Sequence, residues 1–328
     1  MNPEIYKDIS LMAEYNFSIG GAQRMLSAVS KKIRKPIYVL NDSQGPIQPI
    51  WDVDPIPGVP DAPIIISLVV DKYSFRTFSG KKQIKFCHSG ESLENFLGNE
   101  QAKITKWLTH RGRVYNFWKE RGFNIDLIPR GYIPYDKERL EITPIKRDQG
   151  VFISRVCPSK GPELAIQTFD NLAIPLYIAG SNELRDYISS LKKSIKGSNI
   201  AFIPPDEGSG MSLKLRDDLL RESKVLVHCS LGGMHDYLEY SILDGMIFNC
   251  VPLCITPEVE QFSVVEEKCF GRVVRNPTEA VEALEDILSN YGHYSLKVRD
   301  FMGEFLKDQE ALWERWKVKI EEACLKLT

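Results

Sequence analysis

The chain lacks the features that would direct it into a membrane or an oxidising compartment. No apolar run approaches the ~20 residues that a helix needs to cross a bilayer, and the opening MNPEIYKDISLM has no charged segment followed by an apolar one. The seven cysteines are odd in number and form no C-x-x-C pair, so a disulfide framework is not indicated. Cys250 and Cys254 flank an expected strand and are interpreted as small buried hydrophobic residues rather than metal ligands. We therefore expect a cytoplasmic protein.

The composition is that of an ordinary globular protein, with 43% hydrophobic and 26% charged residues. A length of 328 residues exceeds what one core usually organises, so two domains are expected. The net charge of −2 hides an asymmetry. Residues 1–147 carry 22 Lys and Arg against 16 Asp and Glu, a balance of +6, whereas residues 148–328 carry 20 against 28, a balance of −8. The two halves therefore differ in their electrostatic roles.

The most informative stretch is residues 225–253, VLVHCSLGGMHDYLEYSILDGMIFNCVPL. A short apolar run rich in β-branched residues predicts a strand, and Gly232 and Gly233 break it. From Met234 the apolar residues recur at helical spacing, which places the glycines at a helix N-terminus. The free N–H groups and the positive end of the helix dipole suit such a turn to a phosphate.

Glu239 is predicted to lie about one and a half turns into that helix. Its carboxylate can accept hydrogen bonds from vicinal hydroxyls such as those of a ribose, and a phosphate loop followed by a ribose acceptor indicates a nucleotide. Two plainer interpretations stay open. A strand followed by a Gly-Gly turn and a helix is also a common connection in α/β folds that binds no phosphate. A single Glu on a helix is usually a solvated charge.

The first half alternates strands with helices. Strands are expected at 9–17, 36–42, 64–71, 82–90 and 125–134. Helices are expected at 18–33 and at 102–121, the second carrying Trp107 and Trp118. This alternation predicts a parallel sheet with helices on both faces. His88 follows one strand, where parallel sheets place ligands, and is interpreted either as an ordinary turn residue or as an acceptor or phosphate contact.

The second half repeats the alternation. A strand at 149–161 ends in Arg155 and Lys160, and a helix begins with Pro162 in its first turn. Two cations five residues apart around such a turn suit a diphosphate, although solvated surface cations are the alternative. Further strands are expected at 175–181 and 200–207, and the tail after His293 is expected to be helical. This half is therefore predicted to be a second doubly wound domain.

Five sequence motifs occur in an order typical of a known family. They are SIGGAQRML, IDLIPRGYIPYDKERL, FISRVCPSKGPELAIQTF, IAGS and the tail ALWERWKVKIEEA. In turn they resemble the N-terminal glycine loop, the hinge segment, the G-R-L-x-x-x-K-G-x-x-x-x-I-x-A-F motif, the I-A-G-x-G motif and the closing S-W-x-x-x-A helix of family 4 glycosyltransferases. The resemblance extends over nearly the whole chain.

The resemblance implies an α/β protein of the GT-B fold: two doubly wound Rossmann-like domains with a cleft between them and C-terminal helices crossing back. It implies an acceptor-binding domain at 1–147, a nucleotide-sugar-binding domain at 148–294, and helices at 295–328 that pack across the interface. The implied activity is retaining transfer from a nucleotide-sugar, with a UDP-sugar as the expected co-substrate and with no metal or other cofactor.

The same resemblance assigns roles to single residues. Arg155 and Lys160 match the cations that bind the donor diphosphate, and Glu239 matches the second glutamate of E-x7-E, which holds the ribose. Gly20 and Gly21 match the loop that lines the sugar-phosphate from the other domain. The expected donor-binding set also includes Ser230, Gly232, Gly233, Met234 and Asp236, and the expected catalytic set is Arg155, Lys160, His88 and His235.

The chain departs from the family pattern around the donor sugar. Leu231 stands where the family has its first glutamate, and the usual E-G-F-G is shortened to LGGMHD. His235 and Asp236 are the candidates to replace the lost carboxylate. A non-hexose donor such as a pentose is one consequence of this change.

A cationic segment in the first half suggests the acceptor. Residues 72–121 hold 11 Lys and Arg against four Glu, a local balance of +7. These cations are interleaved with the aromatic residues Tyr73, Phe75, Phe86, Trp107, Tyr115 and Trp118. A cationic aromatic face, with Arg76, Arg111 and Arg113 as expected contacts, suits a polyanion such as DNA or an anionic membrane that carries a lipid-linked glycan. The alternative is a solvated charged face.

Phage enzymes that glycosylate hydroxymethylated bases share the GT-B fold, and the compact length favours such an acceptor, which would place the protein in the host cytoplasm. A cell-surface glycan or glycolipid is the alternative acceptor. Two other classes stay open: a nucleotide-sugar epimerase, and an inactive nucleotide-sugar-binding module suggested by Leu231. Nucleotide release from a UDP-sugar in the presence of candidate acceptors separates a transferase from both.

Overall fold

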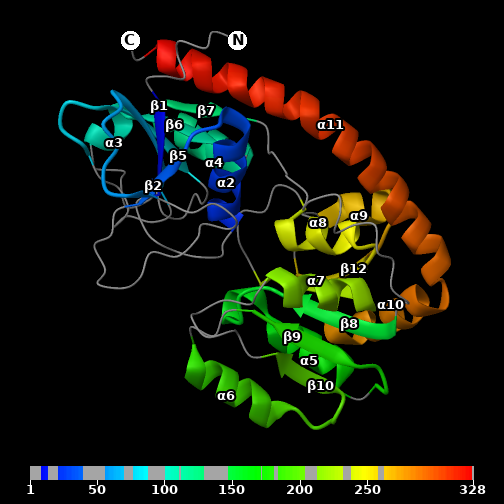
Figure 1. The fold of residues 1–328 in the computed structure, drawn as a ribbon. Coiled ribbons are helices and arrows are strands. Elements are labelled where there is room, and N and C mark those ends of the chain that lie inside the picture. Colours follow the sequence, from blue (N-terminus) through cyan, green and yellow to red (C-terminus); the bar gives the residue numbers. More distant parts are fainter. Residues whose placement is uncertain are drawn as a thin grey trace. The chain divides into compact units, whose positions relative to one another are not determined.

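The computed structural model shows two compact units, each with its own parallel sheet (Figure 1). Unit 1 comprises Met1–Ile133 and Lys307–Thr328, and unit 2 comprises Pro134–Leu306. The structure describes residues 9–13, 21–39, 56–69, 77–87, 100–110, 112–128, 147–170, 172–180, 184–203, 213–231, 238–257 and 262–326. The expected domain boundary after residue 147 differs from this division, which falls after Ile133.

Unit 1 contains a seven-stranded sheet of order β3-β2-β1-β4-β5-β6-β7 with all neighbouring strands parallel. The strands are β1 (Ile9–Ala13), β2 (Ile37–Val39), β3 (Ile56–Pro57), β4 (Ile64–Val69), β5 (Lys82–Cys87), β6 (Lys106–Thr109) and β7 (Ile125–Leu127). The described helices are α2 (Gly21–Ile33), α3 (Glu100–Ile104) and α4 (Gly112–Lys119). Ile64, Ile65 and Ile66 of β4 are buried, as expected for a strand inside a parallel sheet whose two faces are both covered.

The expected helix at 102–121 is wrong. The segment divides into α3, β6 and α4, and all four residues of β6 are buried. Trp107 donates its backbone N–H to Asn124 O at 2.8 Å and its indole Nε1–H to Ala102 O at 2.7 Å. Pairing with β5 and β7 therefore overrides the local helical spacing. A strand between them forms hydrogen bonds with backbone groups of β5 and β7 that would otherwise be buried without partners.

Unit 2 contains a six-stranded parallel sheet of order β10-β9-β8-β11-β12-β13. Its strands are β8 (Arg147–Ile153), β9 (Leu176–Ala179), β10 (Ile200–Ile203), β11 (Ser223–Cys229), β12 (Val251–Ile255) and β13 (Arg272–Val274). The helices described in it up to residue 289 are α5 (Pro162–Phe169), α6 (Arg185–Ser194), α7 (Leu213–Glu222), α8 (Tyr240–Ile247), α9 (Ser263–Glu267) and α10 (Pro277–Ser289). The strand order reverses between β8 and β11, which in doubly wound sheets is where ligands bind.

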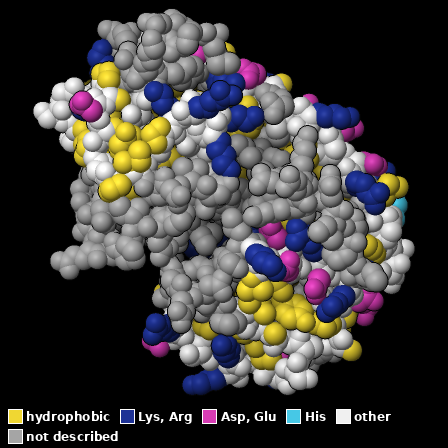
Figure 2. Space-filling model, in the orientation of Figure 1, with side chains coloured by type: hydrophobic (Ala, Val, Ile, Leu, Met, Phe, Trp, Pro, Cys, Tyr) yellow, Lys and Arg dark blue, Asp and Glu magenta, His cyan; other side chains and the backbone are white. Residues whose placement is uncertain are grey.

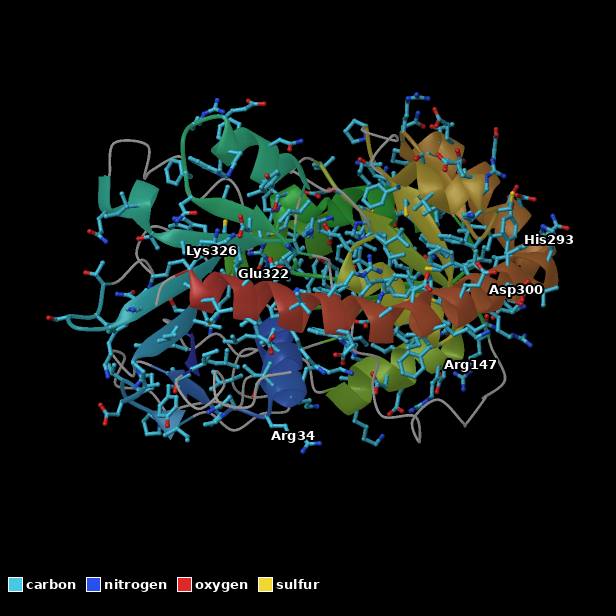
Figure 3. All side chains as sticks on the ribbon, turned by 90° about the horizontal axis from the view of Figure 1, so that it is seen from above. Arg34, Arg147, His293, Asp300, Glu322 and Lys326 are labelled. Atoms are coloured by element: carbon cyan, nitrogen blue, oxygen red, sulfur yellow. The ribbon has the colours of Figure 1, made fainter. Side chains whose placement is uncertain are left out.

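The tail expected as several helices at 295–328 is one helix, α11 (Tyr291–Leu325), within the described residues. Its first part belongs to unit 2, where Phe301 contacts Phe270 with ring centroids 4.5 Å apart. Its last part belongs to unit 1, whose core includes Trp313, Trp316, Ile320, Ala323 and Cys324. In Figure 3, His293 and Asp300 mark the beginning of α11, and Glu322 and Lys326 mark its end. The chain therefore returns to unit 1 after completing unit 2, as predicted.

The seven cysteines are all free thiols. Cys250 and Cys254 are fully buried, so the interpretation of both as small hydrophobic residues is confirmed. Burial raises the pKa of the Cys229 and Cys254 thiols above the ordinary value, because a thiolate is poorly solvated in the core. Among the helices of the described ranges, none combines the length and the apolar composition that crossing a bilayer requires.

Candidate functional site

The connection from β8 to α5 forms one side of the site. Arg155 follows the strand and is exposed, and residues Pro158–Lys160 form a short 3-10 turn, η4. Gly161 then adopts the left-handed conformation (φ 53°) before α5 begins. A Cβ on Gly161 would lie 3.0 Å from Leu231 Cγ, so both its backbone angles and its close contact favour glycine. Leu231 also donates its N–H to Ser159 O at 3.1 Å, which ties this turn to the end of β11.

The segment that follows β11 forms the other side. Ser230 is buried and donates its N–H to Ile255 O at 3.2 Å. Helix α8 packs closely on β11, because a Cβ on Gly245 would lie only 2.7 Å from Leu226 Cδ2. The first contact joins the end of β11 to β12, and the second packs α8 against β11.

Glu239 is the residue that caps the N-terminus of α8. The expected position one and a half turns into the helix is therefore wrong, because Leu238 and Glu239 are not helical and α8 starts at Tyr240. The carbonyl of Glu239 accepts from Ile242 N at 3.0 Å and Leu243 N at 3.2 Å, while its backbone is extended. Its side chain makes no capping hydrogen bond, so the carboxylate is directed instead toward the other side of the site.

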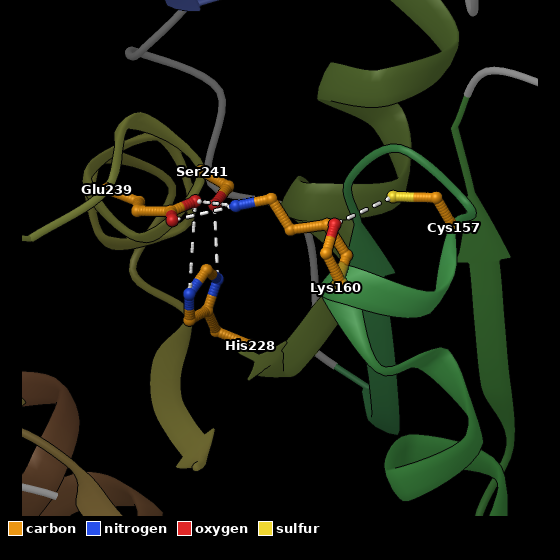
Figure 4. A network of polar contacts seen from close by, with 6 residues as sticks. Cys157, Lys160, His228, Glu239 and Ser241 are labelled. Atoms are coloured by element: carbon orange, nitrogen blue, oxygen red, sulfur yellow. Dashed lines mark hydrogen bonds and ion pairs between the residues drawn. The ribbon is translucent and has the colours of Figure 1, made fainter. Parts of the chain in front are cut away.

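Lys160 and Glu239 are in direct contact (Figure 4). Lys160 Nζ lies 2.7 Å from Oε1 and 2.9 Å from Oε2 of Glu239, although the two residues are 79 positions apart in the sequence. Their side chains are only 15% and 16% exposed. Since Lys160 follows β8 and Glu239 follows β11, the pair spans the point where the strand order of unit 2 reverses. A cation and a hydrogen-bond acceptor are thus brought together where such a sheet binds its ligand.

Two residues outside the predicted set extend this network: His228 lies beside Glu239, and Ser241 contacts His228. His228, in β11, is 2% exposed, and its Nε2 lies 3.9 Å from Glu239 Oε2. Its Nδ1 lies 3.4 Å from Oγ of Ser241, in the first turn of α8 (Figure 4). The available sequence signal was a polar residue at the carboxyl end of a buried parallel strand, the same signal that singled out His88.

Other predicted site residues are placed as follows. Gly21 begins α2 in unit 1, and Arg113 lies in α4 of the same unit. The structure therefore brings Lys160 and Glu239 into contact and places Arg155 and Ser230 on the two connecting segments. The expected residues that lie outside the described parts of the chain are Gly20, Arg76, His88, Arg111, Gly232, Gly233, Met234, His235 and Asp236.

Several residues of the expected acceptor face are buried in unit 1. Lys85 is fully buried and donates to Ser67 Oγ at 2.8 Å. Lys106 is 4% exposed and forms an ion pair with Asp126 at 2.6 Å. The aromatic residues Phe86, Trp107 and Trp118 are buried as well. The two residues of β5 and the two of β6 are buried because both strands lie inside the sheet, where strand pairing rather than the charge pattern decides their position, and Trp118 is buried from α4.

The remaining surface charge is mixed. On the face shown in Figure 2, the described Lys and Arg side chains lie singly or in small groups with Asp and Glu among them. Burial alone would raise the pKa of Asp126, but its hydrogen bond to Lys106 and the charges of Lys106, Lys326 and Lys119 lower it below the ordinary value. Lys106, which belongs to the cationic segment, thus pairs with the partly buried carboxylate of Asp126 instead of facing a partner.

No cluster of three or more His, Cys, Asp or Glu suited to a metal ion occurs among the residues that the structure describes.

Comparison with known proteins identifies the fold. No protein-family model and no curated protein matches the chain, but solved structures do. A glycosyltransferase from Rickettsia africae ESF-5 has a TM-score of 0.67 at 13% identity, covering 98% of this chain and 99% of its own. Anabaena HepE in complex with UDP has a TM-score of 0.69 at 12% identity, covering 96% and 100%. The lipopolysaccharide outer core galactosyltransferase WaaB has a TM-score of 0.56 at 11% identity, covering 96% and 99%. The chain has the GT-B fold, as its motifs predicted.

Proposed function

We propose that the protein is a glycosyltransferase that moves a sugar from a UDP-sugar to an acceptor hydroxyl. The observation that carries the proposal is the contact between Lys160 and Glu239 at the point where the strand order of unit 2 reverses. A cation can bind a diphosphate, and a carboxylate can accept hydrogen bonds from ribose hydroxyls, and both groups are present there. HepE, which shares the fold, was solved in complexes with UDP and with UDP and glucose.

In the proposed reaction, the bond between the anomeric carbon and the β-phosphate oxygen breaks as the acceptor oxygen attacks from the same face. The acceptor proton passes to the departing phosphate oxygen. Lys160 and Arg155 stabilise the negative charge that grows on the diphosphate, and Glu239 holds the ribose throughout. The configuration of the anomeric carbon is retained.

For the acceptor we propose a hydroxyl of a glycan, since the galactosyltransferase WaaB is among the structures that share the fold. A hydroxymethylated pyrimidine in DNA is the second candidate. It is favoured by the nine Lys and Arg of residues 72–121 that remain after Lys85 and Lys106 are assigned to the core. With four Glu in the segment, these nine leave a balance of +5.

The test is transfer of labelled sugar from a panel of UDP-sugars to glycan acceptors and to DNA with and without hydroxymethylcytosine. Sugar transfer to glycans at a rate that added DNA does not change supports the glycan acceptor. Transfer to modified DNA only, together with DNA binding that weakens steeply as salt rises, supports the second. UDP-sugar binding without transfer to any acceptor would instead favour an inactive binding module.

Removal of divalent metal should leave transfer unchanged. The proposed charge stabilisation comes from Arg155 and Lys160, so activity in excess EDTA should remain within about twofold of the untreated enzyme. One D-x-D tripeptide, Asp52-Val53-Asp54, lies outside the described residues. Its two carboxylates are the alternative, as ligands of a divalent metal that would stabilise the diphosphate instead. Loss of activity in EDTA that Mg²⁺ or Mn²⁺ restores, and that replacement of both aspartates by Ala reproduces, would overturn the metal-free proposal.

Cysteine labelling should locate the nucleotide. Cys157 is partly exposed and immediately precedes the turn that carries Lys160, whereas Cys269 is exposed and follows the C-cap residue of α9. Because bound UDP would cover the turn, maleimide labelling of Cys157 should slow at least about tenfold at UDP concentrations near 100 times Kd. Labelling of Cys269 serves as the internal control and should not change. Peptide mass spectrometry measures both rates, and equal rates at Cys157 with and without UDP would contradict the proposed site.

A further inference from the structure

His228 and Ser241 are part of the polar network of the site, yet the proposed reaction gives neither of them a role. The imidazole of His228 is 2% exposed and lies between the two groups at the start of α8: Glu239 on its Nε2 side and Ser241 on its Nδ1 side. The edge of Phe262 packs against it with ring centroids 5.3 Å apart. The ring is therefore held in one place by contacts on three sides.

We infer that His228 is a positioning residue that holds the Glu239 carboxylate for the ribose hydroxyls when Lys160 turns toward the diphosphate. The inference rests on the proposed function. In the structure, the Lys160 ammonium contacts both oxygens of Glu239. The ammonium has three N–H donors, so a lysine that turns to give more than one of them to a diphosphate releases at least one of these contacts. His228 Nε2, 3.9 Å from Oε2, then offers the 16% exposed carboxylate a donor that keeps its orientation.

The tautomer of His228 is linked to the direction of its hydrogen bond with the Ser241 hydroxyl. If the Ser241 hydroxyl donates to Nδ1, the neutral ring carries its proton on Nε2, which faces Glu239. The opposite tautomer would direct a lone pair at the carboxylate. At 3.9 Å the contact between Nε2 and Oε2 is longer than a hydrogen bond. A shift of the carboxylate by about 1 Å would bring it into hydrogen-bonding range, so His228 can replace Lys160 without competing with it in the unliganded protein.

The test compares the binding of UDP with that of 2′,3′-dideoxy-UDP, which lacks the ribose hydroxyls. His228→Asn shortens the side chain and removes the donor near Nε2, so Kd for UDP should rise about tenfold. Kd for the dideoxy compound should stay within about twofold, because the diphosphate contacts are unaffected. His228→Gln, whose amide nitrogen reaches about as far as Nε2, should restore most of the UDP affinity.

The outcomes separate the inference from the proposed function. If wild type does not prefer UDP over the dideoxy compound, the ribose role of Glu239 fails, and the proposed function fails in that part. If wild type shows the preference but His228→Asn weakens both ligands equally, or His228→Gln restores nothing, the inference about His228 is overturned. If the His228→Asn variant does not fold, the Ser241→Ala variant provides the test. Its Kd for UDP should rise by a few-fold while its Kd for the dideoxy compound stays the same, and an unchanged Kd for UDP would contradict the inference.

Discussion

Replacing Lys160 with Ala should lower kcat for sugar transfer by about 10²-fold or more. The ammonium contributes most in the transition state, because the negative charge on the diphosphate is largest as the bond to the sugar breaks. The KM for the donor should change less than kcat. Steady-state kinetics with saturating acceptor and varied UDP-sugar measures both quantities. Arg155→Ala is expected to act in the same direction, since Arg155 lies on the same connection after β8.

Two controls accompany the Lys160 variant. Lys193→Ala removes an exposed lysine of α6 and should leave kcat unchanged. The thermal midpoint of Lys160→Ala must also be measured, because the substitution deprives the partly buried Glu239 of its partner. A kcat within a few-fold of wild type for both Lys160→Ala and Arg155→Ala would remove the diphosphate assignment.

Glu239→Gln should raise the KM for the donor by about tenfold to a hundredfold and leave kcat nearly unchanged. The ribose is bound equally in the ground state and in the transition state, so a contact to it contributes uniform binding. A hydrogen bond to a charged group contributes about 1.5–3 kcal/mol, which corresponds to a change of that size. Glutamine keeps the shape of the side chain, so the effect of the charge is isolated from that of a cavity.

The matched control for this variant is Glu282→Gln, which neutralises an exposed glutamate of α10. It should leave both KM and kcat unchanged. An unchanged KM for Glu239→Gln, or an equal fall of kcat and kcat/KM with KM constant, would contradict a ribose role.

Most of the fold could be predicted from the sequence because strands and helices alternate in it with clear apolar patterns. The segment around Trp107 is the main exception. Its apolar residues recur at helical spacing, but Lys106–Thr109 fills a slot between two strands of the sheet, which local spacing does not reveal. The same slot explains why Lys106, expected on the surface, is buried against Asp126.

The main residues of the candidate site could be predicted from the sequence, but their arrangement in space could not. Lys160 and Glu239 were both singled out, yet their contact depends on β8 and β11 being neighbours, and strand order is not readable from either segment. The position of Glu239 was misjudged because the helical spacing of apolar residues begins before α8 does. His228 was missed because a histidine that follows apolar residues in a strand is usually part of the core.

A crystal structure of the protein with bound UDP would show whether Lys160 and Glu239 hold the nucleotide. We expect diphosphate oxygens within about 2.7–3.0 Å of Lys160 Nζ, and ribose hydroxyls that donate to the Glu239 carboxylate at the carboxyl ends of β8 and β11. UDP bound elsewhere, or a Lys160–Glu239 ion pair left intact beside a bound nucleotide that contacts neither residue, would contradict it.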